Sequence, residues 1–443
     1  MKQFGAYKNY ASLFIPLLLE QGAITLITFV NTALVSGKDN TLINAISLVD
    51  ALTFLLTAVF LAISTGGAIL CANYYGAGEK EKIRAVFRDG TVLGVAVGVT
   101  SMLLAAGGGA WMIRLVYPGI SVSVFHSCAQ YVVFSALSFP FYFLFANNTG
   151  IARACGDTRS PMLITVLQGT VNLSVTSLLL FGFQLGMLSV GFGLLLSRLA
   201  SAAVSFFPIK KYIQGQAVQA KRQYREILRL AVFIALETLF FFLGKLLLQS
   251  FIAALPDAQI TANAVSSSLL SIFTLPGLAL CVLTQNVCGN LAGAGNYFRL
   301  KRFFLEAWAS AAGMLLCISL VSFPLLKFLI GLHTDDPAVF AAALPVMRFT
   351  LLVLPLTWPA GNLAVTALRG CGKVRLVSAV LAASMWMYRV PVSYYLCSVK
   401  GWGTFGVWVC MDFEWLLYCL IFSLVLGGQY LKRKKKSLSY VPA

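Results

Sequence analysis

Acidic residues occur deep within long apolar runs of this 443-residue chain, at Glu20, Asp50, Glu237, Asp412 and Glu414. A charged side chain in hydrocarbon costs roughly 2.5–3.5 kcal/mol even on the lenient insertion scale, so each of them is a candidate functional residue. A carboxyl group in an apolar cavity holds a proton more readily than one in water, and it can exchange that proton for a cation. The chemistry that these residues predict is reversible binding of H⁺ or Na⁺.

Glu20 and Glu237 are the first candidates for cation coupling, because they occupy matching positions of the internal repeat described below. The alternative for each is a carboxyl that is protonated, or paired with a nearby Lys or Arg, and only holds helices together. Asp50 is the third candidate, although it lies near the outer end of its span, where contact with water is the competing explanation. Asp412 and Glu414 follow the outer start of the last span, and we expect structural roles for them.

Polar residues without a net charge occur in the same runs. Asn31 follows Glu20 by eleven residues, which returns it to nearly the same face of a helix. Asn31 and Asn172 are each expected to line a polar cavity or to form an interhelical hydrogen bond. Arg389 precedes Pro391, which leaves a backbone carbonyl without its usual partner. Its guanidinium is expected to satisfy such a carbonyl or an acid, mainly in a structural role.

The composition identifies the surroundings of these residues as a lipid bilayer. Hydrophobic residues make up 59% of the chain and charged residues 11%, whereas a soluble domain has roughly 25% charged residues. The net charge of +18 comes from basic residues in the short gaps between apolar runs, which argues against nucleic-acid binding. The ten cysteines form no CxxC pair and there are two histidines, so neither a metal nor a cofactor is expected.

The apolar runs predict twelve membrane spans, each long enough to cross a hydrocarbon core with roughly 20 residues. We place them near residues 10–36, 43–75, 89–116, 125–152, 161–183, 186–209, 228–254, 259–292, 303–330, 339–366, 376–399 and 403–431.

The distribution of positive charge predicts the orientation. With residues close to a span end counted in the adjoining loop, 25 of the 33 Lys and Arg residues lie at the two ends or in even-numbered loops, four lie in odd-numbered loops and four lie within spans. Basic loops stay in the cytoplasm, so both termini are predicted to be cytoplasmic. We expect a multi-pass protein of the bacterial inner membrane.

Three short segments recur at half the length of the chain. Tyr75-Gly76-Ala77-Gly78 matches Ala292-Gly293-Ala294-Gly295, Leu19-Glu20 matches Leu236-Glu237, and the segment 153–159 matches 369–375. Each half has six spans, an even number, so both halves point the same way. The sequence therefore predicts an all-α membrane protein of two six-helix lobes, related by a pseudo-two-fold axis along the membrane normal.

The same pattern gives domain boundaries. Residues 1–209 form the predicted N-terminal lobe and residues 228–431 the C-terminal lobe. The basic segment 210–227 is the predicted cytoplasmic linker, and residues 432–443 form a basic cytoplasmic tail. Two packed halves with a site near the midplane are typical of transporters.

Seven segments make the chain resemble the multidrug and toxic compound extrusion (MATE) family across nearly its whole length: VNTALVSG, YYGAGEKEK, ARACGDTRSPM, VNLSV, GAGN, ALRGCGK and MYRVPVSYYL. The resemblance implies two V-shaped six-helix lobes that alternate between outward-open and inward-open forms. It also implies export of amphipathic, often cationic, compounds against H⁺ or Na⁺.

The chain departs from the family pattern in its N-terminal half. Relatives commonly have an aspartate in place of Asn31, and often another in place of Thr176, four residues after Asn172. A span-10 aspartate of some members is also missing near Trp358. Glu237 does match the family's span-7 glutamate. We therefore predict that cation coupling uses Glu237, with Glu20 as a possible second group, and that Asn31, Asn172, Thr176 and Arg389 line the polar cavity.

Two other functions compete with an ion-coupled exporter. The first is a flippase for a lipid-linked sugar or another anionic lipid, which basic residues lining the cavity would favour; the basic residues within spans are Arg198, Lys245, Arg348 and Arg389. The second is an intramembrane enzyme, against which the absence of a clustered catalytic set argues. We expect a monomer whose partners are a small amphipathic substrate and membrane lipid, with no cofactor beyond the coupling ion.

Overall fold

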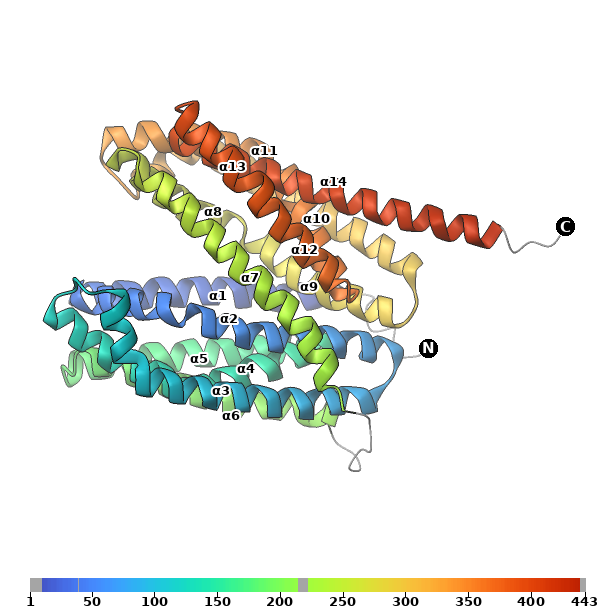
Figure 1. Ribbon diagram of the computed structural model, residues 1–443, viewed down its shortest axis with the longest axis horizontal. Coiled ribbons are helices and arrows are strands. Elements are labelled where there is room, and N and C mark those ends of the chain that lie inside the picture. Colours follow the sequence, from blue (N-terminus) through green and yellow to red (C-terminus); the bar gives the residue numbers. More distant parts are fainter. Residues whose placement is uncertain (1–9, 39, 214–221, 439–443) are drawn as a thin grey trace. The chain divides into compact units, whose positions relative to one another are not determined.

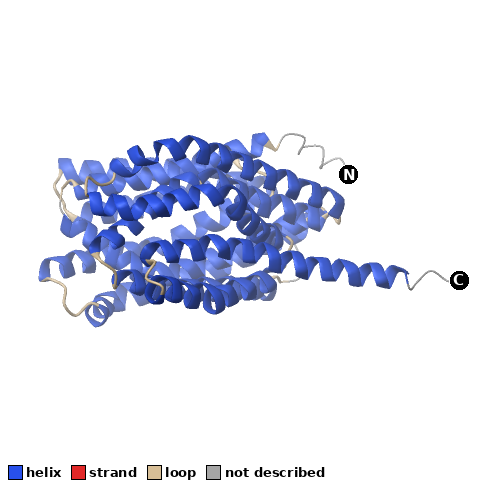
Figure 2. Cartoon of the chain, turned by 90° about the horizontal axis from the view of Figure 1, so that it is seen from above, coloured by secondary structure: helices blue, strands red, loops and turns tan. Residues whose placement is uncertain are grey.

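The computed structural model describes residues 10–38, 40–213 and 222–438. Every regular element in these ranges is a helix (Figure 2). Within them, twelve helical segments are long and apolar enough to cross a membrane: Ala11–Ser36, Thr41–Ala77, Lys80–Val116, Val122–Ala154, Arg159–Gly182, Met187–Ile213, Tyr224–Ala253, Leu275–Gly293, Tyr297–Gly331, Pro337–Gly370, Val374–Val399 and Gly403–Leu424. The predicted twelve spans are confirmed.

The first six spans are α1 (Ala11–Ser36), α2 (Asn40–Ala77), α3 (Lys80–Val116), α4 (Val122–Ala154), α5 (Arg159–Ser177) with the π-helical turn η2 (Leu178–Gly182), and α6 (Met187–Ile213). In this set α4 packs against α2, α3 and α6, while α1 packs against α5 (Figure 1). Close approach depends on small residues: a Cβ at Gly94 of α3 would stand 1.7 Å from the ring of Phe143 in α4.

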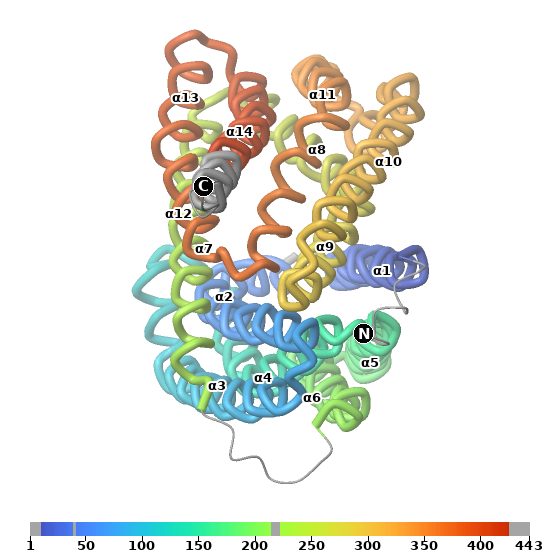
Figure 3. The backbone as a smooth tube through the Cα atoms, turned by 90° about the vertical axis from the view of Figure 1, so that its right-hand side faces the viewer, coloured from blue at the N-terminus to red at the C-terminus, as the bar shows by residue number. Residues whose placement is uncertain are grey.

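The later spans are α7 (Tyr224–Ala253), α8 (Asp257–Phe273) with α9 (Leu275–Gly293), α10 (Tyr297–Gly331) and α11 (Pro337–Gly370). The eleventh combines α12 (Val374–Ser384), η3 (Met385–Arg389), α13 (Val390–Tyr394) and η4 (Tyr395–Val399), and the twelfth is α14 (Gly403–Leu438). Figure 3 shows α14 running beside α12 and α13, which it contacts.

Two predicted spans are interrupted rather than continuous. The span expected at 259–292 breaks at Thr274, because Pro276 lacks the N–H that would continue the helical hydrogen bonds. The span expected at 376–399 contains two π-helical turns, η3 just before Pro391 and η4 after it. Arg389 lies at the end of η3, where the helix is wider than an α-helix.

The chain divides into two compact units. One comprises residues 1–235, 286–297 and 370–372, and the other comprises residues 236–285, 298–369 and 373–443. Residues 214–221 of the predicted linker and 439–443 of the predicted tail lie outside the described residues, and α14 continues through residue 438. The lobe boundaries read from the sequence stay a prediction.

The recurring glycine segments form equivalent turns in the two halves. Gly78 and Gly295 follow α2 and α9 with φ values of +79° and +69°, and Gly156 and Gly372 follow α4 and α11 with φ values of +87° and +77°. This left-handed conformation ends a helix and is favourable for glycine alone. These glycine segments therefore lie at the ends of spans in both halves.

The turn between α4 and α5 is held by Asp157. Its carboxylate accepts hydrogen bonds from the Ser160 backbone N–H at 3.0 Å, the Ser160 hydroxyl at 2.8 Å and Lys211 Nζ at 2.9 Å. Burial acts to raise the pKa of Asp157, but the hydrogen bonds from Lys211 and Ser160 outweigh it, so the pKa lies below the ordinary 3.8. The carboxylate is therefore ionised and bonded at neutral pH.

Replacing Asp157 with asparagine is expected to lower the unfolding free energy at pH 7 by on the order of 1 kcal/mol. Because the folded-state pKa is depressed, this stabilisation is complete above the unfolded-state pKa and disappears as the pH falls through the folded-state pKa. The two proteins should therefore converge in thermal stability in acid. A difference that stays constant from pH 7 to the acid limit would contradict this assignment.

Candidate functional site

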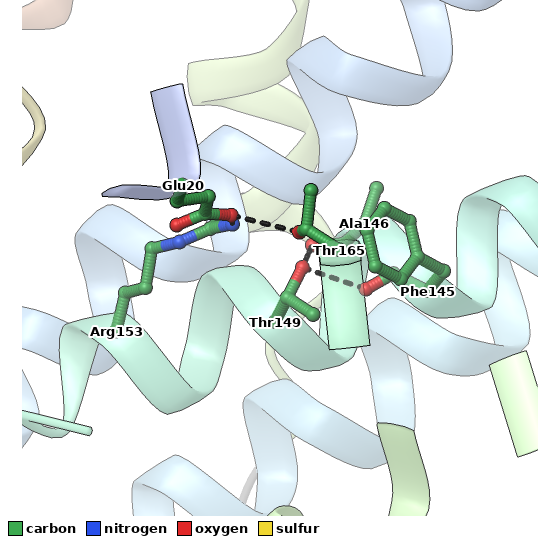
Figure 4. Close-up of polar contacts among 6 residues, drawn as sticks. All are labelled: Glu20, Phe145, Ala146, Thr149, Arg153 and Thr165. Atoms are coloured by element: carbon green, nitrogen blue, oxygen red, sulfur yellow. Dashed lines mark hydrogen bonds and ion pairs between the residues drawn. The ribbon is translucent and has the colours of Figure 1, made fainter. Parts of the chain in front are cut away.

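Glu20 is buried where three helices of the first half meet (Figure 4). It projects from α1 and forms an ion pair with Arg153, in the last turn of α4. The hydroxyl of Thr165, on α5, donates a hydrogen bond to the same carboxylate oxygen at 2.9 Å. One carboxylate thus joins α1, α4 and α5.

Glu237 has the same kind of surroundings in the second half. It projects from α7 and forms an ion pair with Arg369, in the last turn of α11. The hydroxyl of Ser378, on α12, donates to its other carboxylate oxygen at 2.7 Å. Its side chain is 11% exposed, whereas that of Glu20 is 1% exposed, so the second cluster is the more accessible of the two.

The two clusters use the same three spans of each half. In both, the glutamate comes from the first span, the arginine from the end of the fourth and the hydroxyl from the fifth. The arginines occupy the first position of the repeated segment that also supplies Gly156 and Gly372. Pairing with a Lys or Arg is the alternative that the sequence offers for both glutamates, but the sequence does not identify Arg153 and Arg369 as the partners, although the common offset of the Glu and Arg repeats is a signal for them.

This arrangement stabilises the ionised carboxylate. An arginine and a hydroxyl compensate the loss of hydration that a buried carboxylate suffers. Each cluster also ties together the first, fourth and fifth spans of its half.

The predicted polar cavity residues of the first half lie further along α1 and α5. A Cβ atom added at Gly169 of α5 would stand only 2.1 Å from the side chain of Ile27 in α1, so these two helices are tightly packed. Asn31 lies one turn beyond Ile27, and Asn172 lies one turn beyond Gly169, so both amides are at a similar level. Thr176 is fully buried against Gly193 of α6.

Asp50 does not join either cluster. It is exposed, as the competing explanation from the sequence anticipates, and it lies beside the hydroxyl of Tyr131. The nearby Arg198 donates to the Ser138 hydroxyl at 2.6 Å and lies 4.5 Å from the ring centroid of Tyr142. Asp50 and Arg198 therefore belong to a separate polar group between α2, α4 and α6.

Arg389 is paired with an acid, one of the two roles expected for it. Its Nη1 lies 3.1 Å from Glu414 Oε2, and its guanidinium lies 5.8 Å from the ring centroid of Phe241. Glu414 is fully buried, and the Arg389 side chain is 11% exposed. The pair joins the π-helical turn η3 to α14, which supports the structural role expected of Glu414.

The MatE family model matches residues 16–178 and 234–395, which is most of the chain. The chain belongs to the MatE family. The two matched segments coincide with the two halves of the repeat, and each contains one complete Glu–Arg–hydroxyl cluster.

Individual relatives are distant but cover the whole length. The chain is 22% identical over 440 residues to the probable multidrug resistance protein NorM of Thermotoga maritima, covering 96% of this chain and 93% of that protein. It is 23% identical over 410 residues to the probable multidrug resistance protein YoeA of Bacillus subtilis, covering 89% and 87%.

Solved structures of MatE relatives confirm the fold. An outward-facing multidrug resistance MATE family transporter of the MOP superfamily matches with a TM-score of 0.86 at 19% identity, over 96% of this chain and 95% of that one. A MOP superfamily transporter from Pyrococcus furiosus, described as having a binding pocket of reverse polarity, matches with a TM-score of 0.85 at 18% identity and the same coverage. The predicted class of all-α, twelve-span transporter fold is thereby confirmed.

Proposed function

We propose that this MatE family protein exports amphipathic, mainly cationic, compounds in exchange for H⁺ or Na⁺. It works by alternating access in the bacterial cytoplasmic membrane, with both termini in the cytoplasm. The observation that carries the proposal is the repeated Glu–Arg–hydroxyl cluster, because it places one ion-binding carboxylate on the first span of each half. The names of the NorM and YoeA relatives, both probable multidrug resistance proteins, support the substrate class.

Glu237 is the proposed principal coupling residue. Its carboxylate is more accessible than that of Glu20, and it matches the family's span-7 glutamate. When the ion binds, Arg369 loses its partner, and the contact between α7 and α11 weakens. When the ion leaves, the ion pair forms again. The Glu237 carboxylate thus alternates between two partners, Arg369 and the coupling ion. Such competition is what exchange of the ion requires.

The flippase alternative needs free basic groups to bind an anionic lipid. The guanidinium of Arg389 is occupied by Glu414, and that of Arg198 lies against Ser138 and Tyr142. Lys245 and Arg348 are exposed side chains. The partners of Arg389 and Arg198 make an exporter of cations the better supported function.

The experiment that tests the proposal is transport by the purified protein in liposomes. A pH gradient and a Na⁺ gradient are imposed separately, and a fluorescent cationic dye reports movement. We expect one of the two gradients to drive the dye against its concentration gradient, while protein-free liposomes show only leakage. If neither gradient moves the dye and an anionic lipid or lipid-linked sugar crosses the bilayer instead, the exporter proposal is wrong.

A further inference from the structure

Asp412, on α14, is the buried acid that the two clusters and the Arg389 pair leave unexplained. In the described part of the chain four acidic side chains are buried, and three of them have an arginine partner: Glu20, Asp89 and Glu414. Asp412 is the fourth, is 1% exposed, and forms no ion pair with any described residue. Its carboxyl therefore lies in the interior of the second unit without a compensating positive charge at contact distance.

The hydrogen bonds of Asp412 are also incomplete. The hydroxyl of Thr350, on α11, donates to Asp412 Oδ2 at 3.1 Å, and Asp412 Oδ1 has no hydrogen-bond partner in the described structure. Asp412 and Glu414 are two residues apart on one helix, so their side chains point in nearly opposite directions. Glu414 consequently faces Arg389, while Asp412 faces α11.

The remaining titratable groups do not neutralise Asp412 directly. Arg389 is already bonded to Glu414, and it is the guanidinium nearest to both acids. Lys245 of α7 is exposed and forms no ion pair with either acid. The other titratable side chains around the pair of acids are neutral ones on η3 and α14: Tyr388, Cys410 and Tyr418. Two carboxyls therefore share one buried cation.

We propose that Asp412 is a proton-binding site, which holds a proton in the conformation seen here. Burying a carboxylate without a partner costs far more free energy than burying the neutral acid, so the group takes up a proton instead. A metal cation would need several oxygen ligands around it, whereas Thr350 supplies one. The protonated carboxyl group needs no additional oxygen ligands, because its Oδ2 accepts the hydrogen bond from Thr350 and its Oδ1 carries the proton.

The role of the Asp412 site in transport depends on the proposed function, and the site adds a detail to that function. It identifies the proton as an ion carried by the second half of the exporter, separately from Glu237. Loss of the proton would leave an anion between α11 and α14, where it must gain water. Deprotonation therefore separates these two helices locally, which is a step that a pH gradient can drive.

Infrared spectroscopy of the purified wild-type protein tests the site without any need for transport. We expect the C=O stretching band of a protonated carboxylic acid at neutral pH, and its loss in Asp412→Asn. Thr350→Val should shift the band to higher frequency, because the carbonyl oxygen loses its hydrogen bond. Asp257→Asn, which removes an exposed aspartate, is the matched control and should leave the band unchanged.

A spectrum of Asp412→Asn identical to that of the wild type would overturn the proposal, as would a band that Thr350→Val does not move. Should Asp412→Asn fail to fold, Thr350→Val alone decides the matter, because the frequency shift reports on Asp412 in an otherwise intact site. A protein that shows the Asp412 band but moves no dye under either gradient would overturn the proposed function and leave the proton site supported.

Discussion

Replacing Glu237 with glutamine is expected to reduce gradient-driven export in proteoliposomes to the level of protein-free vesicles. Glutamine keeps the shape of the side chain and can still bond to Ser378, but it cannot bind and release an ion with a change of charge. Arg369 also loses its anion, so the competition between the arginine and the ion ends. Initial rates of dye movement under the pH gradient and under the Na⁺ gradient measure the effect.

Ser378→Ala is the matched control for this variant. It removes a single hydrogen bond from the same carboxylate, worth about 1.5–3 kcal/mol, and leaves the charge in place. We expect export by Ser378→Ala to be slower than in the wild type but to remain above the level of protein-free vesicles. Export by Glu237→Gln at the wild-type rate would show that coupling lies elsewhere in the chain.

Replacing Arg389 with alanine is expected to destabilise the protein by about 3–5 kcal/mol, which is the largest stability effect that we predict. The substitution leaves Glu414 fully buried without its guanidinium partner, so its carboxyl must either keep an uncompensated charge or take up a proton, and either outcome costs free energy. Thermal unfolding of the purified protein in detergent, at neutral pH, measures the loss. Glu414→Gln should cost less, because the glutamine can still accept a hydrogen bond from Arg389, whose side chain is also less completely buried than that of Glu414.

The double variant Arg389→Met with Glu414→Leu distinguishes the contribution of the ion pair to stability from the contribution of side-chain packing. Replacing both members of a buried ion pair by apolar residues of similar size is often neutral or stabilising. We therefore expect the double variant to be more stable than Arg389→Ala. If the two are equally unstable, the contribution of Arg389 comes from its packing against Phe241 rather than from the ion pair.

The fold could be predicted from the sequence because it depends on coarse properties. Runs of roughly 20 apolar residues must cross the membrane as helices, since every backbone polar group in hydrocarbon must bond within its own segment. Repeats at half the chain length then give the two halves. The breaks at Thr274 and near Arg389 were less predictable, because the effect of a proline on a helix depends on what its neighbours can satisfy.

The site could be predicted only in part. Charge in an apolar run drew attention to Glu20 and Glu237, but their arginine partners lie more than 130 residues away in the sequence. Asp412 was expected to have a structural role like that of Glu414, because a spacing of two residues does not show which neighbouring helix each side chain will meet. Only the packing of α14 shows that Asp412 meets α11 whereas Glu414 meets η3.

Binding of a cationic dye to the purified protein tests the central claim most directly, namely that Glu237 couples binding of the ion to binding of the substrate. Dye affinity is measured by fluorescence anisotropy over a range of pH and of Na⁺ concentration, in the wild type and in Glu237→Gln. We predict that affinity in the wild type falls as the coupling ion is added, and that this dependence is lost in Glu237→Gln. The same ion dependence in both proteins would contradict the claim.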